Sequence, residues 1–241
     1  MTSLIQKIGK LAIQTFRRDQ SLTKSTFNTK YAELSVLVND LTSQEVNLSD
    51  ELVADSGKDF TAGRDGAPVI YMQLYEDLDV NICMFILKRG VRLPLHDHPG
   101  MYGLLKVVHG KVAIQSYSIT GSKADPKHLE SASIMPAKKH TVEYITAEDN
   151  VCLLTPENQN LHSISAVDGP AAFLDILAPP YGSERDCHYF QEVESSDIIP
   201  ELEGSNIVFL AKIPSPSDFW CDQADYKGPH LDASVLHHNG S

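Results

Sequence analysis

Residues 90–110 read GVRLPLHDHPGMYGLLKVVHG and contain a His-x-His pair, His96 and His98. In an extended segment, side chains two residues apart point to the same side, so both imidazoles share one face while Asp97 faces the other way. Two imidazoles on one strand supply half of a metal site. The third ligand must come from a distant strand, and His162, in the run Asn-Leu-His-Ser-Ile, is the best candidate.

The sequence around this stretch is dominated by short runs rich in β-branched residues, which begin at Val69. Turn-forming pairs such as His109-Gly110 and Asp168-Gly169 separate them. Many short strands at even spacing are typical of a sandwich or a barrel. The expected strands are Val69–Leu74, Val80–Leu87, Leu104–Val108, Lys111–Ile119, Thr141–Ile145, Val151–Thr155, Leu161–Ala166, Ala171–Leu177 and Asn206–Ile213.

The first 55 residues have a helical pattern instead. Apolar residues fall on one face of the first helix, as expected for a helix docked on a core: Leu4, Ile5, Ile8, Leu11, Ala12 and Phe16. The first 18 residues also carry basic side chains and no acid, so the composition leaves a transit peptide open as an alternative. We predict a single domain over residues 1–241 of mainly β class, with a helical N-terminal layer (1–55), a β-barrel (68–213) and a Pro-containing tail (214–241).

The composition argues against several classes of function. A formal net charge of −12 disfavours nucleic-acid binding, which needs a basic surface. No apolar run approaches the length of a membrane span. The cysteines are widely spaced without a Cys-x-x-Cys pair, which indicates neither a structural zinc site nor a disulfide framework. We expect reduced thiols and a cytoplasmic location, with the nucleus as an alternative and the mitochondrion disfavoured.

The glycines around the histidine pair add a family signal. Gly90, five residues, His96-x-His98, then Gly103, six residues and Gly110 resembles the first motif of the cupin superfamily. That resemblance implies a double-stranded β-helix, a jelly-roll-like barrel. Cupins usually place a ligating Glu four or five residues after the second His, where this chain has Tyr102 and Gly103. A neutral site of three histidines is therefore expected.

Three histidines suit Zn, Fe(II), Ni or Cu, so the ligand type alone leaves the metal open. Zinc with an open water position would support hydrolytic or isomerase chemistry. Six-coordinate Fe(II) would leave places for a bidentate substrate and O₂. The His-x-His spacing disfavours the oxoglutarate-dependent oxygenases, which use two histidines and a carboxylate.

Several longer stretches resemble the 2-aminoethanethiol (cysteamine) dioxygenase and plant cysteine oxidase family. They are residues 95–107, Phe173–Tyr181, Arg185–Tyr189 and 219–221. The resemblance implies a cupin barrel with Fe(II) held by His96, His98 and His162, and O₂ as cosubstrate. It implies conversion of a thiol to a sulfinic acid, with small aminothiols such as cysteamine, or peptides and proteins that begin with Cys, as substrates.

The resemblance also assigns roles beyond the metal ligands. It places Asp175 in the active site, near the substrate amine, although a strand Asp satisfied by backbone or Arg is an equal alternative. Cys187 and Tyr189 share one face if extended, and family members can form a thioether between such a pair, whereas ordinary packing is the plainer interpretation. Tyr102 and Tyr181 are candidates to line the substrate pocket or to be buried aromatics with satisfied hydroxyls.

The main functional hypothesis is therefore a thiol dioxygenase, acting as a monomer without nucleic-acid or membrane partners. The family link also makes it a candidate oxygen sensor, because sulfinic acid at a protein N-terminus can feed an N-degron pathway. The alternative from another class is a cupin that binds a metal or ligand without turnover, which the fold alone cannot exclude.

Overall fold

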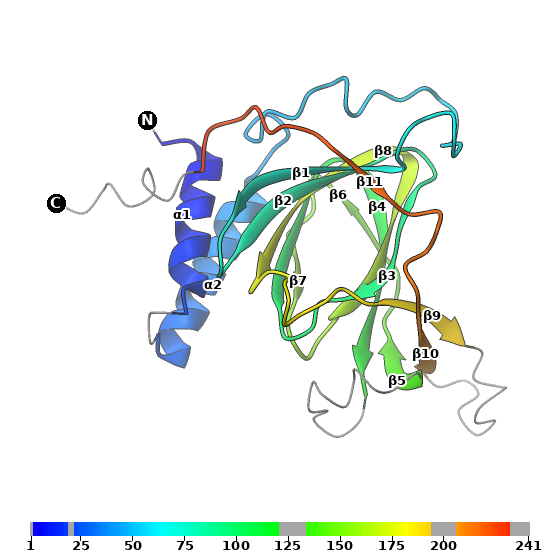
Figure 1. Cartoon of the computed structure of the whole chain (residues 1–241). Coiled ribbons are helices and arrows are strands. Elements are labelled where there is room, and N and C mark those ends of the chain that lie inside the picture. The colour runs from blue at the N-terminus through cyan, green and yellow to red at the C-terminus, as the bar shows by residue number, and fades with distance from the viewer. Residues whose placement is uncertain (1, 19–21, 121–133, 194–205, 232–241) are drawn as a thin grey trace.

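The computed structural model describes residues 2–18, 22–120, 134–193 and 206–231. Two helices precede the strands, which all belong to one hydrogen-bonded sheet (Figure 1). The elements are α1 (Leu4–Phe16), α2 (Lys24–Asn39), β1 (Val69–Glu76), β2 (Asn81–Leu87), β3 (Arg92–Asp97), β4 (Tyr102–Ile119), β5 (Ile134–Lys139), β6 (Glu143–Thr146), β7 (Cys152–Leu154), β8 (Leu161–Ala178), β9 (Tyr189–Val193), β10 (Ile207–Ile213) and β11 (Cys221–Gln223).

The first helix begins at a capping box. The Ser3 hydroxyl accepts from the Gln6 amide, and the Gln6 side chain accepts from the Ser3 amide. Its apolar face is buried through Ile5, Ile8 and Ala12, so the predicted docked helix is present. Residues 40–55, which the helical pattern also covered, form turns, because polar turn formers follow α2 and Asn47 adopts a positive φ of 48°.

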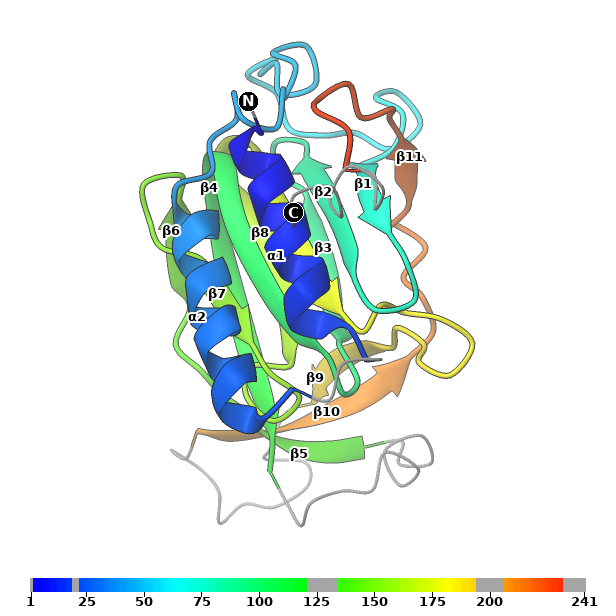
Figure 2. The same ribbon diagram turned by 90° about the vertical axis from the view of Figure 1, so that its left-hand side faces the viewer.

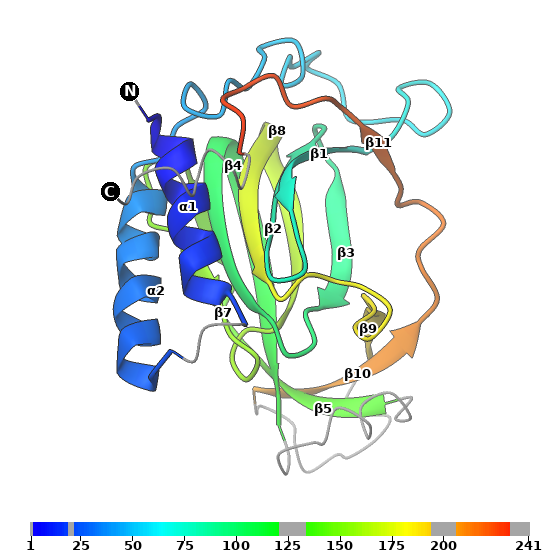
Figure 3. The same ribbon diagram turned by 60° about the vertical axis from the view of Figure 1, so that its left-hand side comes forward.

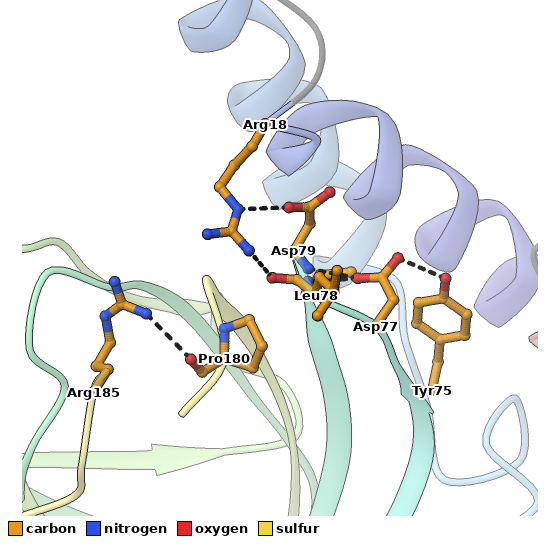
Figure 4. Close-up of polar contacts among 8 residues, drawn as sticks. Arg18, Tyr75, Asp77, Leu78, Asp79, Pro180 and Arg185 are labelled. Carbon is orange, nitrogen blue, oxygen red and sulfur yellow. Dashed lines mark hydrogen bonds and ion pairs between the residues drawn. The ribbon is translucent and has the colours of Figure 1, made fainter. Parts of the chain in front are cut away.

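The end of α1 is tied to the turn between β1 and β2 (Figure 4). Arg18 donates to the Asp79 carboxylate at 2.7 Å and to the Leu78 carbonyl. Asp77 shapes this turn by accepting from the amides of Asp79 (2.8 Å) and Val80 (2.9 Å). The Arg18 side chain is 60% exposed, so this ion pair orients the helix more than it stabilises the fold.

The strands close into a barrel. Hydrogen-bonded pairing runs from β8 to β3, β9, β10, β5 and β4, and β4 pairs with β8 again. The sheet continues beyond β8 through β2, β1 and β11, while β6 and β7 pair with β4. This is the mainly β barrel with N-terminal helices that the sequence predicted.

Two predicted turns are instead irregularities within long strands. The runs around His109-Gly110 join into β4, and those around Asp168-Gly169 join into β8, with the register between β4 and β8 shifting near His109. Gly110 permits this close crossing, because a Cβ there would lie 2.3 Å from the Pro170 carbonyl oxygen and its φ is +70°. Both His-Gly and Asp-Gly dipeptides favour a turn, but hydrogen bonds to the partner strand keep each strand continuous at these positions.

The helices α1 and α2 lie over one face of the β4–β8 pair (Figures 2 and 3), and this pair separates two apolar clusters. Its outer face, with Leu104, Leu174 and Ile176, packs against α1 and α2. Its inner face, with Leu105 and Phe173, fills the barrel. Strand alternation therefore assigns every second residue of β8 to the barrel interior, where a site can form. Neither described helix is long and apolar enough to cross a membrane.

Candidate metal centre

The three histidines predicted as ligands lie together inside the barrel. His96 belongs to β3, His98 follows directly after it, and His162 belongs to β8. His96 and His162 are direct partners in the β3–β8 register. Each pair of rings has centres 4.8 Å apart, and the Nε2 atoms of His98 and His162 are 3.1 Å apart. These side chains form a group that could hold a metal ion.

Hydrogen bonds orient two of the imidazoles. The Nδ1 atom of His96 lies 2.8 Å from the Pro94 carbonyl, which can only accept, so Nδ1 carries the proton. Tyr181 donates its hydroxyl proton to the Asp97 carbonyl (2.6 Å), so it accepts from Nδ1 of His98 (2.8 Å). Both rings therefore keep an unprotonated Nε2, the tautomer that a metal requires.

Burial holds the histidines neutral. It is the largest cause of the lowered pKa of His96. Burial lowers the pKa of His98 and of His162 well below the usual value, and neighbouring imidazoles of the group add to both shifts. A neutral imidazole is the ligand form, so the site is prepared for a cation near neutral pH.

The spacing fits a single ion. Two nitrogens at right angles and about 2.1 Å from one divalent ion would lie about 3.0 Å apart, close to the 3.1 Å between His98 and His162. No side chain fits at Gly103, one of the positions where cupins carry a ligating Glu, because a Cβ there would lie 2.7 Å from Leu154 Cγ. The side chains that could hold an ion here are therefore three neutral histidines.

The histidines line a cavity of about 220 Å³. Two surface hollows of about 400 and 550 Å³ are larger, but neither is lined by the three histidines. The remaining lining is mostly apolar or aromatic with a few polar groups, which is typical of a small-molecule site: Phe85, Leu93, Ile164, Phe173, Asp175, Leu177, Tyr181, Cys187, Tyr189 and Phe219.

Asp175 is the one carboxylate among the described residues that line this cavity. It lies on the inner face of β8 and is 4% exposed, and its Oδ1 atom has no hydrogen-bond partner in the part of the chain that the structure describes. Burial raises the pKa of Asp175 to about 7, and a hydrogen bond from the Ile176 amide opposes that shift. A buried carboxyl with a free oxygen beside a cluster of imidazoles is suited to bind a polar ligand group.

Tyr181, Cys187 and Tyr189 meet at another side of the same cavity. Burial raises the pKa of the Cys187 thiol to about 11, and that thiol lies within hydrogen-bonding reach of both hydroxyls. Burial also raises the pKa of Tyr189 to about 12. The structure thus brings Cys187 and Tyr189 together as the sequence predicted, with a neutral thiol beside a neutral phenol.

The structure does not bring Tyr102 to the cavity. Its ring packs against Phe16, Phe27 and Tyr31, with ring centres 5.2 to 6.3 Å away. Tyr102 starts β4 in phase with Leu104, so strand alternation turns it to the outer, helix-covered face. The residue type suited a pocket, but the direction of the strand determines the face.

Sequence reasoning missed Asn160, which connects the segment around His98 to the start of the strand that carries His162. Asn160 donates to the carbonyls of His98 (2.7 Å) and Thr155 (2.9 Å) and accepts from the His98 amide (3.3 Å). It lies two residues before His162, so it couples both ligand segments. A polar Asn immediately before a strand that carries a ligand was a weak signal, because its partner is 62 residues away.

Comparison with known proteins identifies the family to which the chain belongs. A family model described as PCO_ADO matches residues 37–231. The chain belongs to the PCO_ADO family. The 2-aminoethanethiol dioxygenase of Mus musculus is 37% identical over 255 residues, which cover 96% of this chain and 97% of the mouse protein.

Other relatives agree with the PCO_ADO assignment. The 2-aminoethanethiol dioxygenase of Homo sapiens is 33% identical over 96% of this chain and 97% of the human protein. Plant cysteine oxidase 1 of Arabidopsis thaliana is 30% identical over 68% of this chain and 55% of the plant protein. The predicted family membership is confirmed, and with it the prediction of an enzyme of the thiol dioxygenase class.

Proposed function

We propose that this protein uses Fe(II) and O₂ to convert the thiol of cysteamine, and of N-terminal cysteine in peptides and proteins, to a sulfinic acid. The observation that carries the proposal is the group of three neutral histidines facing a small cavity that also contains the free carboxyl oxygen of Asp175. The reaction adds both atoms of O₂ to one sulfur, so atoms and electrons balance without another reductant.

Iron fits this chemistry better than zinc does. Three histidines can bind either metal, but zinc has no redox chemistry. Bound Fe(II) would activate O₂ and favour the thiolate form of the substrate. His96, His98 and His162 would hold the ion, each through a nitrogen kept unprotonated by burial or by a hydrogen bond.

The residues of the chain would select the substrate. An aminothiol can place its amine beside Asp175, whose buried carboxyl favours a cationic or hydrogen-bond-donating group. Free cysteine would bring a second carboxylate into the same cavity, which like-charge repulsion disfavours. A peptide lacks that carboxylate at its first residue, and about 220 Å³ is enough for a first residue while the rest of the peptide stays outside.

Aromatic and aliphatic side chains would keep the thiol away from bulk water. Phe85, Leu93 and Phe219 line the cavity around the polar groups. A water-poor site strengthens the interaction between Asp175 and the substrate amine. It also protects a partly oxidised sulfur from side reactions.

Mass spectrometry tests the proposal directly. The purified chain is loaded anaerobically with Fe(II), mixed with a peptide that begins with Cys, and exposed to air, with cysteamine and free cysteine in parallel. We expect a gain of two oxygen atoms on peptide and cysteamine, little on free cysteine, and a loss of more than about a hundredfold in His162→Ala. Oxidation that persists in His162→Ala would contradict the assignment of the ligands.

Two other outcomes would overturn the proposal. Bound iron without oxidation of any thiol would favour a cupin that binds a ligand without turnover. Activity with Zn(II) on an ester or amide, and none with O₂, would favour the hydrolytic alternative. The matched control is Glu184→Gln, which removes an exposed carboxylate three residues before Cys187 and should keep the wild-type activity.

The cellular setting is part of the proposal. The cysteines at positions 83, 152, 187 and 221 are all free thiols, which supports a reducing compartment such as the cytoplasm. We infer a monomer, because one chain supplies all three histidines and the cavity. A role in oxygen sensing requires a rate that depends on O₂ across the physiological range, and initial rates at graded O₂ test it.

A further inference from the structure

One side of the cavity is an irregular segment, residues 181–188, here called the pocket wall. It contributes Tyr181 and Cys187 to the cavity lining and leads directly into β9 at Tyr189. Apart from an isolated bridge between Gly182 and Arg185, it belongs to no regular strand. Its position therefore depends on side-chain contacts more than on sheet pairing.

Asp97 makes contact with both ends of this wall. Its carbonyl accepts from the Tyr181 hydroxyl at 2.6 Å. Its amide donates to the His188 carbonyl at 3.1 Å. Its carboxylate accepts from the His188 amide at 2.8 Å and from the His188 ring Nδ1 at 3.0 Å.

Alternation explains why the two side chains meet. His96 and His98 point into the cavity, so Asp97 between them points out of it. Cys187 and Tyr189 also point into the cavity, so His188 between them points out as well. The side chains of Asp97 and His188 thus meet behind the site, and they are only 14% and 20% exposed.

Among the described residues, Tyr181 of the wall also accepts from Nδ1 of His98 (2.8 Å), whereas the side-chain contact of Arg185 does not reach the histidine strand. Arg185 donates to the Pro180 carbonyl at 3.4 Å (Figure 4), so it joins two neighbouring parts of the same irregular stretch. Burying a carboxylate costs desolvation free energy, which its hydrogen bonds must offset. Both oxygens of Asp97 are bonded to the wall, and neither belongs to the cavity.

We propose that the Asp97–His188 pair positions the pocket wall against the histidine strand and thereby sets where Cys187 and Tyr189 stand relative to the substrate. The pair acts through the residues that it holds and does not touch the substrate. This role deepens the proposed function, and its kinetic consequence rests on that function. The placement of the wall can be measured without turnover.

Alkylation of Cys187 in the purified full-length chain tests the placement. Labelling with iodoacetamide is followed residue by residue by mass spectrometry. In His188→Ala we expect the rate at Cys187 to rise about tenfold, because the wall opens locally, while buried Cys83 keeps its rate. His188→Asn, whose amide can donate to Asp97 from the position of Nδ1, should restore the rate to within about threefold of the wild type.

The matched control is Glu184→Gln, which removes an exposed carboxylate from the same wall. Labelling of Cys187 in this control should stay within about twofold of the wild type. Unchanged labelling of Cys187 in His188→Ala would overturn the proposal. Equal acceleration at all four cysteines, in His188→Ala and His188→Asn alike, would also overturn it, since that pattern indicates general loss of stability.

Steady-state kinetics supply the second readout. In His188→Ala we expect kcat for a Cys-initiated peptide to fall about tenfold at unchanged iron content, with a smaller change in KM, because misplaced residues act on orientation. Rescue by His188→Asn separates positioning from a general effect. If no variant, wild type included, oxidises a thiol while Cys187 labelling still responds to His188→Ala, the proposed function fails and the positioning of the wall stands.

Discussion

The inner and outer faces of the β4–β8 pair each bury a charged residue, and they satisfy it differently. On the outer face, Lys106 is 2% exposed and donates to the carbonyls of Ala147 (2.8 Å) and Asp149 (2.5 Å). On the inner face, one register position away, Asp175 is 4% exposed and keeps an unpaired oxygen. A satisfied buried group serves stability, whereas an unpaired one lowers it, and at Asp175 the unpaired oxygen belongs to a residue that lines the cavity. The two faces thus separate folding from function.

The largest effect expected from this difference is the pH dependence that Asp175 imposes on stability. Burial raises its pKa from 3.8 to about 7, so the folded state binds the proton more tightly than the unfolded state. This contribution is fully present below about pH 4 and is lost as pH rises to about 7, beyond which it is constant. Three pKa units correspond to at most about 4 kcal/mol.

The comparison of wild type with Asp175→Asn isolates this contribution. Urea unfolding of the metal-free chain between pH 4 and 8 should show wild-type stability falling relative to the variant until about pH 7. Metal-free protein is needed because a bound cation would favour the ionised carboxylate. Glu51→Gln, on an exposed side chain, is the control. Parallel curves for wild type and Asp175→Asn would show that the inner face does not bury an unpaired acid.

Truncating an apolar side chain on the outer face should lower stability without changing activity. Leu174 is fully buried between β8 and the helices, so Leu174→Ala should lower the free energy of unfolding by about 3 kcal/mol. Activity per folded molecule should be unchanged. Leu78→Ala removes a leucine that is 82% exposed, and its effect should stay below about 0.5 kcal/mol. If Leu174→Ala raised the KM for the thiol without lowering the free energy of unfolding, the two faces would not have separate roles.

Much of this arrangement was readable from the sequence, because it depends on local periodicity. Alternation alone placed His96 and His98 on one side and Asp97 on the other, and the hydrogen bonds of Asp97 with His188 agree. The barrel class followed from the short β-branched runs. The need for a third ligand from a distant strand pointed to His162, the family resemblance agreed, and the structure brings it beside the other two.

The rest depends on contacts between residues far apart in the chain. The pairs His109-Gly110 and Asp168-Gly169 have turn chemistry, yet β4 and β8 run through them because each strand pairs with the other. Asp97, the hydrogen-bond partner of His188, lies 91 residues away, so no local sequence pattern predicts the pair. A shift of one residue along a strand moves a side chain from the cavity to the outer face. The sequence alone therefore could not predict which face Tyr102 occupies.

Two tyrosines that looked equivalent in the sequence provide the finest test of the comparison. Tyr181 bonds Nδ1 of His98, so Tyr181→Phe should weaken metal affinity about tenfold, measured by competition with a chelator. Tyr102 packs its ring on the outer face, so Tyr102→Phe keeps the ring and should leave metal affinity and kcat/KM within about twofold of the wild type. If Tyr102→Phe instead lowered kcat/KM as much as Tyr181→Phe, residues on the outer face would influence the chemistry, and the two faces could not be treated as independent. If both variants matched the wild type, the hydrogen bond from His98 to Tyr181 would not be what orients that ligand.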